Sequence, residues 1–268
     1  MFITFLSDFG LQDDFVGTCH GVVKRIAPEA EIIDITHGIP PQQVLQGALV
    51  LANTLPYMPL GVHLAVVDPG VGGARRPLAL ADAEGRRYVG PDNGLLVVAA
   101  ERFGGVVAAH ELANPEYALQ PVSRTFHGRD LFAPAAAHLA RGVALDDLGP
   151  PVAPDALVHL DLPEPRLDAG EITATALYVD RYGNVQLNLT REHLELMRIA
   201  PGTRLGLELH GEPREVVAAR TFADAPPGTT ILYEDSYGSV ALAVNTGNAA
   251  QELGAKAGEI VRINLRRP

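Results

Sequence analysis

The sequence predicts an α/β protein: an N-terminal α/β domain with a mostly parallel sheet flanked by helices, followed by a small C-terminal β-barrel domain. Two observations predict this fold class. Over roughly the first 160 residues, short apolar runs alternate with segments of helical period, and a parallel sheet with crossover helices buries both kinds of segment. After residue 165, apolar and polar residues alternate along short segments, which is typical of a small barrel or sandwich.

The N-terminal elements follow from these patterns in order. Residues 2–6 predict the first strand. Residues 13–26 predict a helix, because apolar side chains recur near helical spacing until Ala27-Pro28 ends the pattern. The remaining segments predict a strand at 32–35, a helix at 42–55, strands at 62–67, 77–81 and 87–89, and helices at 94–103 and 130–139.

A proline-rich segment separates the two parts of the chain. Prolines are dense between residues 148 and 169 and include Pro150-Pro151; they remove backbone donors and block helices, as expected of a linker. We therefore expect one domain over residues 1–164 and a second over 165–268. In the second, strands are predicted at 173–179, 185–188, 204–209, 215–219, 230–233, 240–244 and 259–263, with a short helix at 192–197.

Composition and charge exclude several classes of protein. Lys and Arg number 21 and Asp and Glu 32, giving a net charge of −11, so neither nucleic acid nor an anionic membrane is an expected partner. Cys19 is the only cysteine, which excludes an intramolecular disulfide and a multi-cysteine zinc or iron–sulfur site. The N-terminus lacks a basic leader, and no apolar run approaches the roughly 18 residues of a membrane helix, so we expect a cytoplasmic protein.

Familiar catalytic motifs fail on spacing. No Gly-Lys pair exists, which excludes a Walker A loop, and no serine lies in a Gly-x-Ser-x-Gly elbow. Residues 70–75 resemble a dinucleotide loop but lack the third glycine, and His110-Glu111 lacks the second histidine of a zinc protease helix. Asp8-Phe9-Gly10 matches the kinase magnesium triplet, but nothing upstream can form a nucleotide-binding lobe.

Polar residues nevertheless gather at the predicted strand ends. Asp8 and Asp13 follow the first strand, Asp68 and Arg75 follow the strand at 62–67, and His127 enters a helix. Because the carboxyl ends of strands in an open α/β sheet form the ligand crevice, we expect these groups to converge. Each residue alone has an ordinary structural interpretation as a helix cap, a turn residue or half of a surface ion pair.

Several short strings in order resemble one family. They are SDFG at 7–10 with Asp13 and FVG at 15–17, VVDPGVG at 66–72 with Arg75, GPDNG at 90–94, TFHGRD at 125–130, DRYGNV at 180–185, and SYG at 236–238 with Asn245. The chain resembles the S-adenosyl-L-methionine (SAM) hydroxide adenosyltransferases, the SAM hydrolases related to the fluorinase and chlorinase enzymes. The resemblance spans nearly the whole chain.

The resemblance implies an N-terminal α/β domain that carries the catalytic residues, a C-terminal barrel that completes the nucleoside site, and a homotrimer with active sites between neighbouring subunits. It implies attack of water or hydroxide on ribose C5′ of SAM, releasing adenosine and L-methionine, with no cofactor and no metal. The catalytic residues that it implies are Asp68, Arg75 and His127. The implied substrate-binding residues are Asp8, Asp13, Asn93, Phe126, Asp180, Asn184, Ser236, Tyr237 and Asn245.

The residue types make this chemistry intelligible. Methionine leaves a sulfonium as a neutral thioether and needs no general acid, so the difficulty lies in the nucleophile, because water has a pKa of about 15.7. Asp68 is the candidate base, while a guanidinium at Arg75 would weaken Asp68 as a base but would stabilise hydroxide formed beside it. Whether Asp68, Arg75 or His127 handles the proton is open at this point.

Three alternatives are open beside hydrolysis. A SAM-dependent halogenase is disfavoured, because such enzymes replace the hydrolase aspartate and place a small hydroxyl residue where this chain has Gly128. A non-catalytic sensor of SAM or adenosine would have the same binding residues. A metal-dependent phosphohydrolase using Asp8, Asp13 and Asp14 lacks histidine ligands or a lysine at useful spacing.

Overall fold

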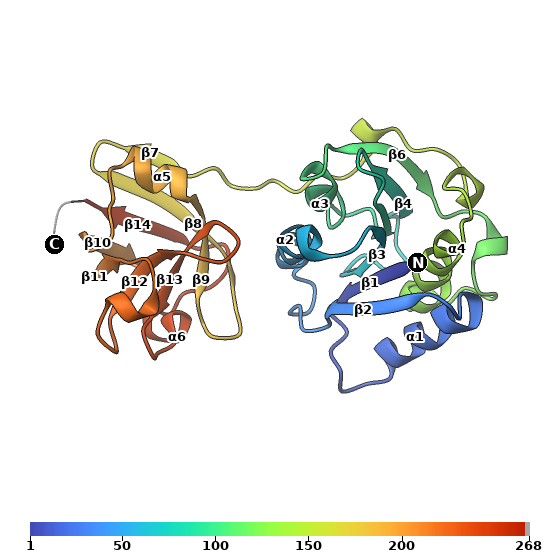
Figure 1. The fold of residues 1–268 in the computed structure, drawn as a ribbon, viewed down its shortest axis with the longest axis horizontal. Helices are drawn as coiled ribbons and strands as arrows, with labels where there is room; N and C mark the ends of the chain where they lie inside the picture. Colours follow the sequence, from blue (N-terminus) through green and yellow to red (C-terminus); the bar gives the residue numbers. More distant parts are fainter. Residues whose placement is uncertain (266–268) are drawn as a thin grey trace. The chain divides into compact units, whose positions relative to one another are not determined.

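The computed structural model describes residues 1–265, in two compact units, Met1–Leu160 and Asp161–Pro268 (Figure 1). Each unit has its own hydrophobic core. The predicted combination of an N-terminal α/β region and a C-terminal β-barrel is confirmed. No helix in residues 1–265 combines the length and the hydrophobicity that crossing a bilayer requires.

The first unit is built on a six-stranded mixed sheet. Its strands are β1 (Phe2–Ser7), β2 (Glu31–Thr36), β3 (Gly61–Val66), β4 (Pro77–Asp82), β5 (Arg87–Pro91) and β6 (Val106–Glu111), in the order β2-β1-β3-β5-β4-β6. The pairs β1–β2, β1–β3 and β3–β5 are parallel, whereas β4 runs antiparallel to both β5 and β6. The parallel strands therefore bring the carboxyl ends of β1 and β3 to the same edge, where Asp8 and Asp68 follow.

Helices cover both faces of this sheet. On one face lie α1 (Phe15–Ile26) and α4 (Ala133–Ala140), and on the other α2 (Val44–Thr54) and α3 (Val97–Glu101) (Figure 1). The pleat of β1 explains this, because Ile3 and Phe5 join the core under α1 and α4 while Leu6 joins the core under α2 and α3.

Several boundaries differ from the sequence prediction for local reasons. Helix α1 begins at Phe15 rather than at residue 13, and the Asp14 carboxylate accepts the Thr18 hydroxyl at its start. The predicted helix at 130–139 is two elements, since Gly128–Phe132 forms a π-helical turn before α4. Strand β6 was not predicted, because its sequence is rich in alanine and only partly buried at the sheet edge.

The proline-rich segment packs on the first unit. Val152 N donates to Ala109 O (2.8 Å), Glu111 N donates to Pro150 O (3.0 Å), and Leu157 is buried. Val158 N donates to the Asp92 carboxylate (2.9 Å). Edge strand β6 is thus covered by residues 150–152, and the first unit extends to Leu160.

The second unit is a closed seven-stranded barrel. Its strands are β8 (Glu171–Val179), β9 (Val185–Thr190), β10 (Arg204–Leu209), β11 (Glu212–Ala218), β12 (Thr230–Glu234), β13 (Ser239–Val244) and β14 (Ile260–Asn264), and the pairing of β14 with β8 closes the barrel. A short strand β7 (Arg166–Asp168) pairs with the start of β8, α5 (Arg191–Leu196) follows β9, and α6 (Ala249–Leu253) precedes β14. Alternate residues along each strand fill the interior.

Candidate active site

Asp68 and Arg75 form a buried ion pair directly after β3. Arg75 Nε donates to Asp68 Oδ1 (2.9 Å) and Oδ2 (3.0 Å), and Arg75 Nη2 also contacts Oδ2. The side chains are 9% (Arg75) and 6% (Asp68) exposed. The connecting turn needs Gly72, whose φ is +74° and whose Cβ, if present, would lie 2.2 Å from Arg124 O. The turn thus returns the chain so that residue 75 faces residue 68.

His127 joins this pair through the same guanidinium. Arg75 Nη2 donates to His127 Nδ1 (2.7 Å), so the imidazole is neutral, with its hydrogen on Nε2. Burial chiefly, and then the charge of Arg75, lower the pKa of His127 below its usual 6.5, while the Asp68 carboxylate opposes this shift. The structure therefore brings Asp68, Arg75 and His127 together, as the sequence predicts.

Asp8 lies at the end of β1, next to β3. Its backbone N–H donates to Val66 O (3.3 Å), and its carboxylate accepts Gln42 N (2.9 Å). Burial raises the pKa of Asp8, the charge of Asp68 adds to this shift, and the backbone donor at Gln42 opposes it. Asp8 therefore shares the electrostatic environment of Asp68.

The other three predicted residues of this unit differ in their placement. Phe126 packs against Phe9 and Phe15, with ring centroids 5.9 and 5.2 Å apart. Asp13 is exposed before α1. Asn93 uses its amide within the chain, since Nδ2 donates to Val67 O (2.9 Å) and Oδ1 accepts Leu95 N (3.2 Å). Asn93 thus supports the segment that leads into Asp68.

Gly128 packs tightly against this aromatic cluster. A Cβ added at Gly128 would lie 2.9 Å from Phe9 Cζ and 3.3 Å from Phe126 Cε2. A hydroxyl-bearing side chain at this position would require both rings to shift.

The second unit has a pocket of about 290 Å³ at the barrel surface. Its lining consists of Tyr178, Asp180, Asn184, Gln186, Phe222, Tyr233, Asp235, Ser236, Tyr237 and Ala241. Four of the predicted residues, Asp180, Asn184, Ser236 and Tyr237, are therefore brought together. Asn245 is not among the lining residues, and its Nδ2 donates to Ala225 O (2.7 Å) in a neighbouring loop.

Asp180 organises one wall of this pocket. Its Oδ1 accepts the backbone N–H groups of Tyr182 (2.8 Å) and Asn184 (2.9 Å), and its Oδ2 accepts Asn184 Nδ2 (2.8 Å). Together with burial, which is the larger cause, Asp180 and Asp235 raise the pKa of Tyr233 to about 12. The pocket is therefore acidic and suits a ligand with a positive charge.

Gln186 is a pocket residue that the sequence prediction missed. It is 4% exposed, and its Oε1 has no hydrogen-bond partner within residues 1–265. The signal in the sequence was a single glutamine between Val185 and Leu187, which both enter the barrel core. A lone polar residue in an apolar strand is a weak signal unless the strand faces are known.

Two family models match almost the whole described chain. The model of the SAM hydroxide adenosyltransferase N-terminal domain matches residues 3–149, and that of the C-terminal domain matches residues 174–262. The chain belongs to the SAM hydroxide adenosyltransferase family. The resemblance inferred from the sequence strings is thus confirmed.

Known relatives of this family member cover its full length. An (R)-S-adenosyl-L-methionine hydrolase of Salinispora arenicola is 51% identical, with 97% of each chain covered. A fluorinase of Nocardia brasiliensis is 31% identical, covering 98% of this chain and 96% of its own. A crystal structure of a conserved protein from Thermotoga maritima is 34% identical, with a TM-score of 0.91 over 98% of this chain and 99% of that one.

The SAM hydroxide adenosyltransferase domains divide the predicted residues between them. Asp8, Asp68, Arg75 and His127 lie in the segment matched by the N-terminal model, and the acidic pocket lies in the segment matched by the C-terminal model.

Proposed function

We propose that this protein hydrolyses SAM to adenosine and L-methionine. The observation that carries the proposal is the buried Asp68–Arg75–His127 cluster beside Asp8, in a chain 51% identical to a protein named an (R)-S-adenosyl-L-methionine hydrolase. In the reaction, water oxygen forms a bond to C5′ and the C5′–S bond breaks. The sulfur keeps the electron pair of that bond and leaves as a neutral thioether, and the water loses one proton.

The geometry assigns different tasks to the three catalytic residues. Arg75 holds Asp68 through Nε and Nη2 and so places a positive charge where hydroxide develops. Asp68 accepts the proton of the attacking water. His127 is neutral and presents an N–H at Nε2, because its Nδ1 already accepts from Arg75, so it orients the water rather than deprotonating it.

The binding residues complete this proposal. Asp8 would accept both hydroxyls of the ribose, for which the two oxygens of a carboxylate are suited. Asp13 and the acidic barrel pocket at Asp180 would receive the cationic methionine end, with Ser236 and Tyr237 beside it. The carbonyl oxygen and amide group of Asn184 would read the adenine edge, and Phe126 would pack against the ligand.

Tight packing at Gly128 favours water over halide as the nucleophile. A serine or threonine there would bring its Cβ within 2.9 Å of Phe9, so the chain as folded leaves no room for a hydroxyl side chain at that point. The Asp68 carboxylate accepts the proton of the water, and the positive charge of Arg75 stabilises the hydroxide that develops.

The proposal includes the assembly and the surroundings of the enzyme. We propose a homotrimer with active sites between neighbouring subunits, a small-molecule substrate and no resident cofactor. A cytoplasmic location, expected from the sequence, is part of the same proposal.

Labelled water tests the reaction. Wild-type and Asp68→Asn proteins would be incubated with SAM in halide-free buffer containing ¹⁸O water, and the products followed by mass spectrometry. We expect label at the 5′ oxygen of adenosine, and a loss of rate on the order of 10²–10⁴-fold in Asp68→Asn. The exposed Asp147, whose backbone carbonyl alone contacts Asn114, provides the matched control Asp147→Asn, which should retain activity.

Three outcomes would overturn this proposal. SAM binding without turnover in the wild type would point to a sensor, and a 5′-halogenated nucleoside formed after halide addition would point to a halogenase. Unlabelled adenosine would exclude water as the nucleophile.

A further inference from the structure

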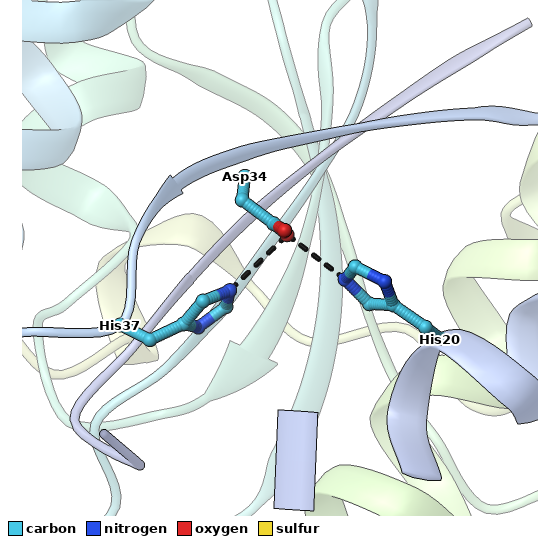
Figure 2. Close-up of side chains that lie close together, drawn as sticks. All are labelled: His20, Asp34 and His37. Atoms are coloured by element: carbon cyan, nitrogen blue, oxygen red, sulfur yellow. Dashed lines mark hydrogen bonds and ion pairs between the residues drawn. The ribbon is translucent and has the colours of Figure 1, made fainter. Parts of the chain in front are cut away.

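Two histidines and an aspartate meet beside the end of β1, where His37 contacts Ser7, the residue before Asp8. His20 lies on α1, Asp34 on β2, and His37 directly after β2. Figure 2 shows both imidazole rings pointing at the Asp34 carboxylate. His20 Nε2 lies 2.9 Å and His37 Nε2 3.1 Å from the same oxygen, Asp34 Oδ1. The family resemblance implies no metal, so this cluster was not expected from the sequence.

His37 carries the strongest indication of a missing ligand. Its side chain is 3% exposed, and despite the short distance to Asp34 its Nε2 lacks a hydrogen bond of acceptable geometry within residues 1–265. Its Nδ1 is held by Ser7 Oγ (2.7 Å). A buried imidazole nitrogen with only a poorly aligned carboxylate beside it is costly, and here it points into a space shared with that carboxylate, Asp34, and a second imidazole, His20.

The surroundings of His37 fix its ring as metal sites require. Ser7 engages one nitrogen, Phe5 packs edge-on at 4.7 Å between ring centroids, and the backbone carbonyl of His37 accepts Gly10 N (2.8 Å). Metal-binding histidines characteristically have their second nitrogen hydrogen-bonded in this way.

We infer that His20, Asp34 and His37 form a binding site for a divalent transition metal ion of the zinc class. The possible ligand atoms all lie within 4.8 Å of one another. A tetrahedral ion with bonds of about 2.0–2.1 Å places its ligand atoms roughly 3.4 Å apart. The two nitrogen–oxygen distances to Asp34 Oδ1, 2.9 and 3.1 Å, therefore need to open by only a few tenths of an ångström. Two imidazoles and a carboxylate suit zinc, cobalt or nickel better than magnesium or calcium.

The open side of the site gives an ion access and a fourth ligand. His20 is 32% and Asp34 41% exposed, so water can complete the coordination while His37 closes the inner side. The ion would join α1 to the edge strand β2, and we assign it this structural role.

Metal titration of the chelator-treated protein tests the site. We expect one Co²⁺ per chain, seen as d–d absorption bands and displaced by Zn²⁺, together with a rise in Tm on Zn²⁺ addition. His20→Gln and Asp34→Asn change partly exposed side chains and should each weaken Zn²⁺ binding by at least about tenfold in calorimetry. Circular dichroism would show that both variants are folded.

His210→Gln is the matched control, because His210 pairs with Glu259 (3.0 Å) on the barrel and is half exposed. Its Zn²⁺ affinity should equal that of the wild type. The inference would be overturned if the wild type showed no stoichiometric Co²⁺ bands. It would also be overturned if both ligand variants kept the wild-type Zn²⁺ affinity, or if His210→Gln lost as much Zn²⁺ affinity as they do. Asp68→Asn should keep the Co²⁺ bands, so this result is independent of the hydrolysis assay.

Discussion

Arg75 connects the charges of the active site, because a single guanidinium donates to both Asp68 and His127. The side chain also lies with Cζ 5.2 Å from the Phe132 ring centroid. A lysine offers one compact charge in place of this planar fork and would not serve both partners with the same geometry. Arg75 and Asp68 therefore shift the pKa of His127 in opposite directions.

These opposite effects can be measured by titrating His127 with NMR. In the wild type its pKa lies below 6.5. Arg75→Gln removes a positive neighbour and should raise that pKa, whereas Asp68→Asn removes a negative neighbour and should lower it further. Because the neutral ring accepts from Arg75, wild-type activity should fall as the pH drops through the His127 pKa.

The exposed His159 provides an internal control, since its signals should be the same in all three proteins. Shifts of the His127 pKa in the same direction in both variants would contradict the electrostatic account of the cluster.

At the same scale, sequence reasoning reached the residues whose positions follow from strand ends. Asp8 and Asp68 come together because the parallel strands β1 and β3 end at one edge. Arg75 joins them through the turn after β3, and His127 through the segment before the π-helical turn. Asn93 and Asn245 stay predictions as substrate-binding residues, and in this structure their amides hold nearby backbone carbonyls. The partners of an amide depend on how loops fold back, which no local pattern encodes.

At the scale of elements, the turn after β3 determines whether Arg75 reaches Asp68. Gly72 has φ +74°, and a Cβ added there would clash with Arg124 O. Gly85 has φ +88° in an open turn, and a Cβ added there would have no atom within 4 Å. Gly72→Ala and Gly85→Ala therefore share the cost of a left-handed alanine, about 1–2 kcal/mol. Only Gly72→Ala adds a backbone clash.

We expect Gly72→Ala to lower the free energy of unfolding by roughly 1–3 kcal/mol more than Gly85→Ala, in urea titrations followed by fluorescence. Gly72→Ala should also lose activity, because the clash displaces the segment that carries Arg75. Equal stability and activity of the two variants would show that the turn tolerates a side chain at residue 72.

Helices and strands with a clear pattern of apolar residues were predicted well. Those whose conformation depends on contacts with distant segments were not. Strands β1 and β3 are apolar runs buried at nearly every residue, and strand β12 has a buried apolar centre. Helices α1 and α2 bury residues at helical spacing. Strand β6 and helix α6 depend on contacts with neighbouring segments; residues 150–152, for example, cover the edge of β6. The His20–Asp34–His37 cluster was missed for a similar reason, since a helix and an edge strand bring its members together.

At the scale of the whole molecule, the predicted residues are divided between two units with separate cores. Asp68, Arg75 and His127 belong to the first unit, and the acidic pocket with Asn184 belongs to the second. If each active site lies between neighbouring subunits of a trimer, the two sets of residues come from different chains. Native mass spectrometry should then give three times the 28.5 kDa chain mass.

Mixing two inactive variants tests where the active site is assembled. Asp68→Asn would inactivate the first unit and Asn184→Ala the second, and differently tagged chains would be coexpressed and purified through both tags. Every mixed trimer then has both wild-type halves at one of its three sites, so activity should return to about a third of the wild-type value. Coexpressed Asp68→Asn and His127→Gln chains form the control, because every first unit is then defective and activity should stay absent. Mixed trimers of the first pair without activity would place each complete site within one chain.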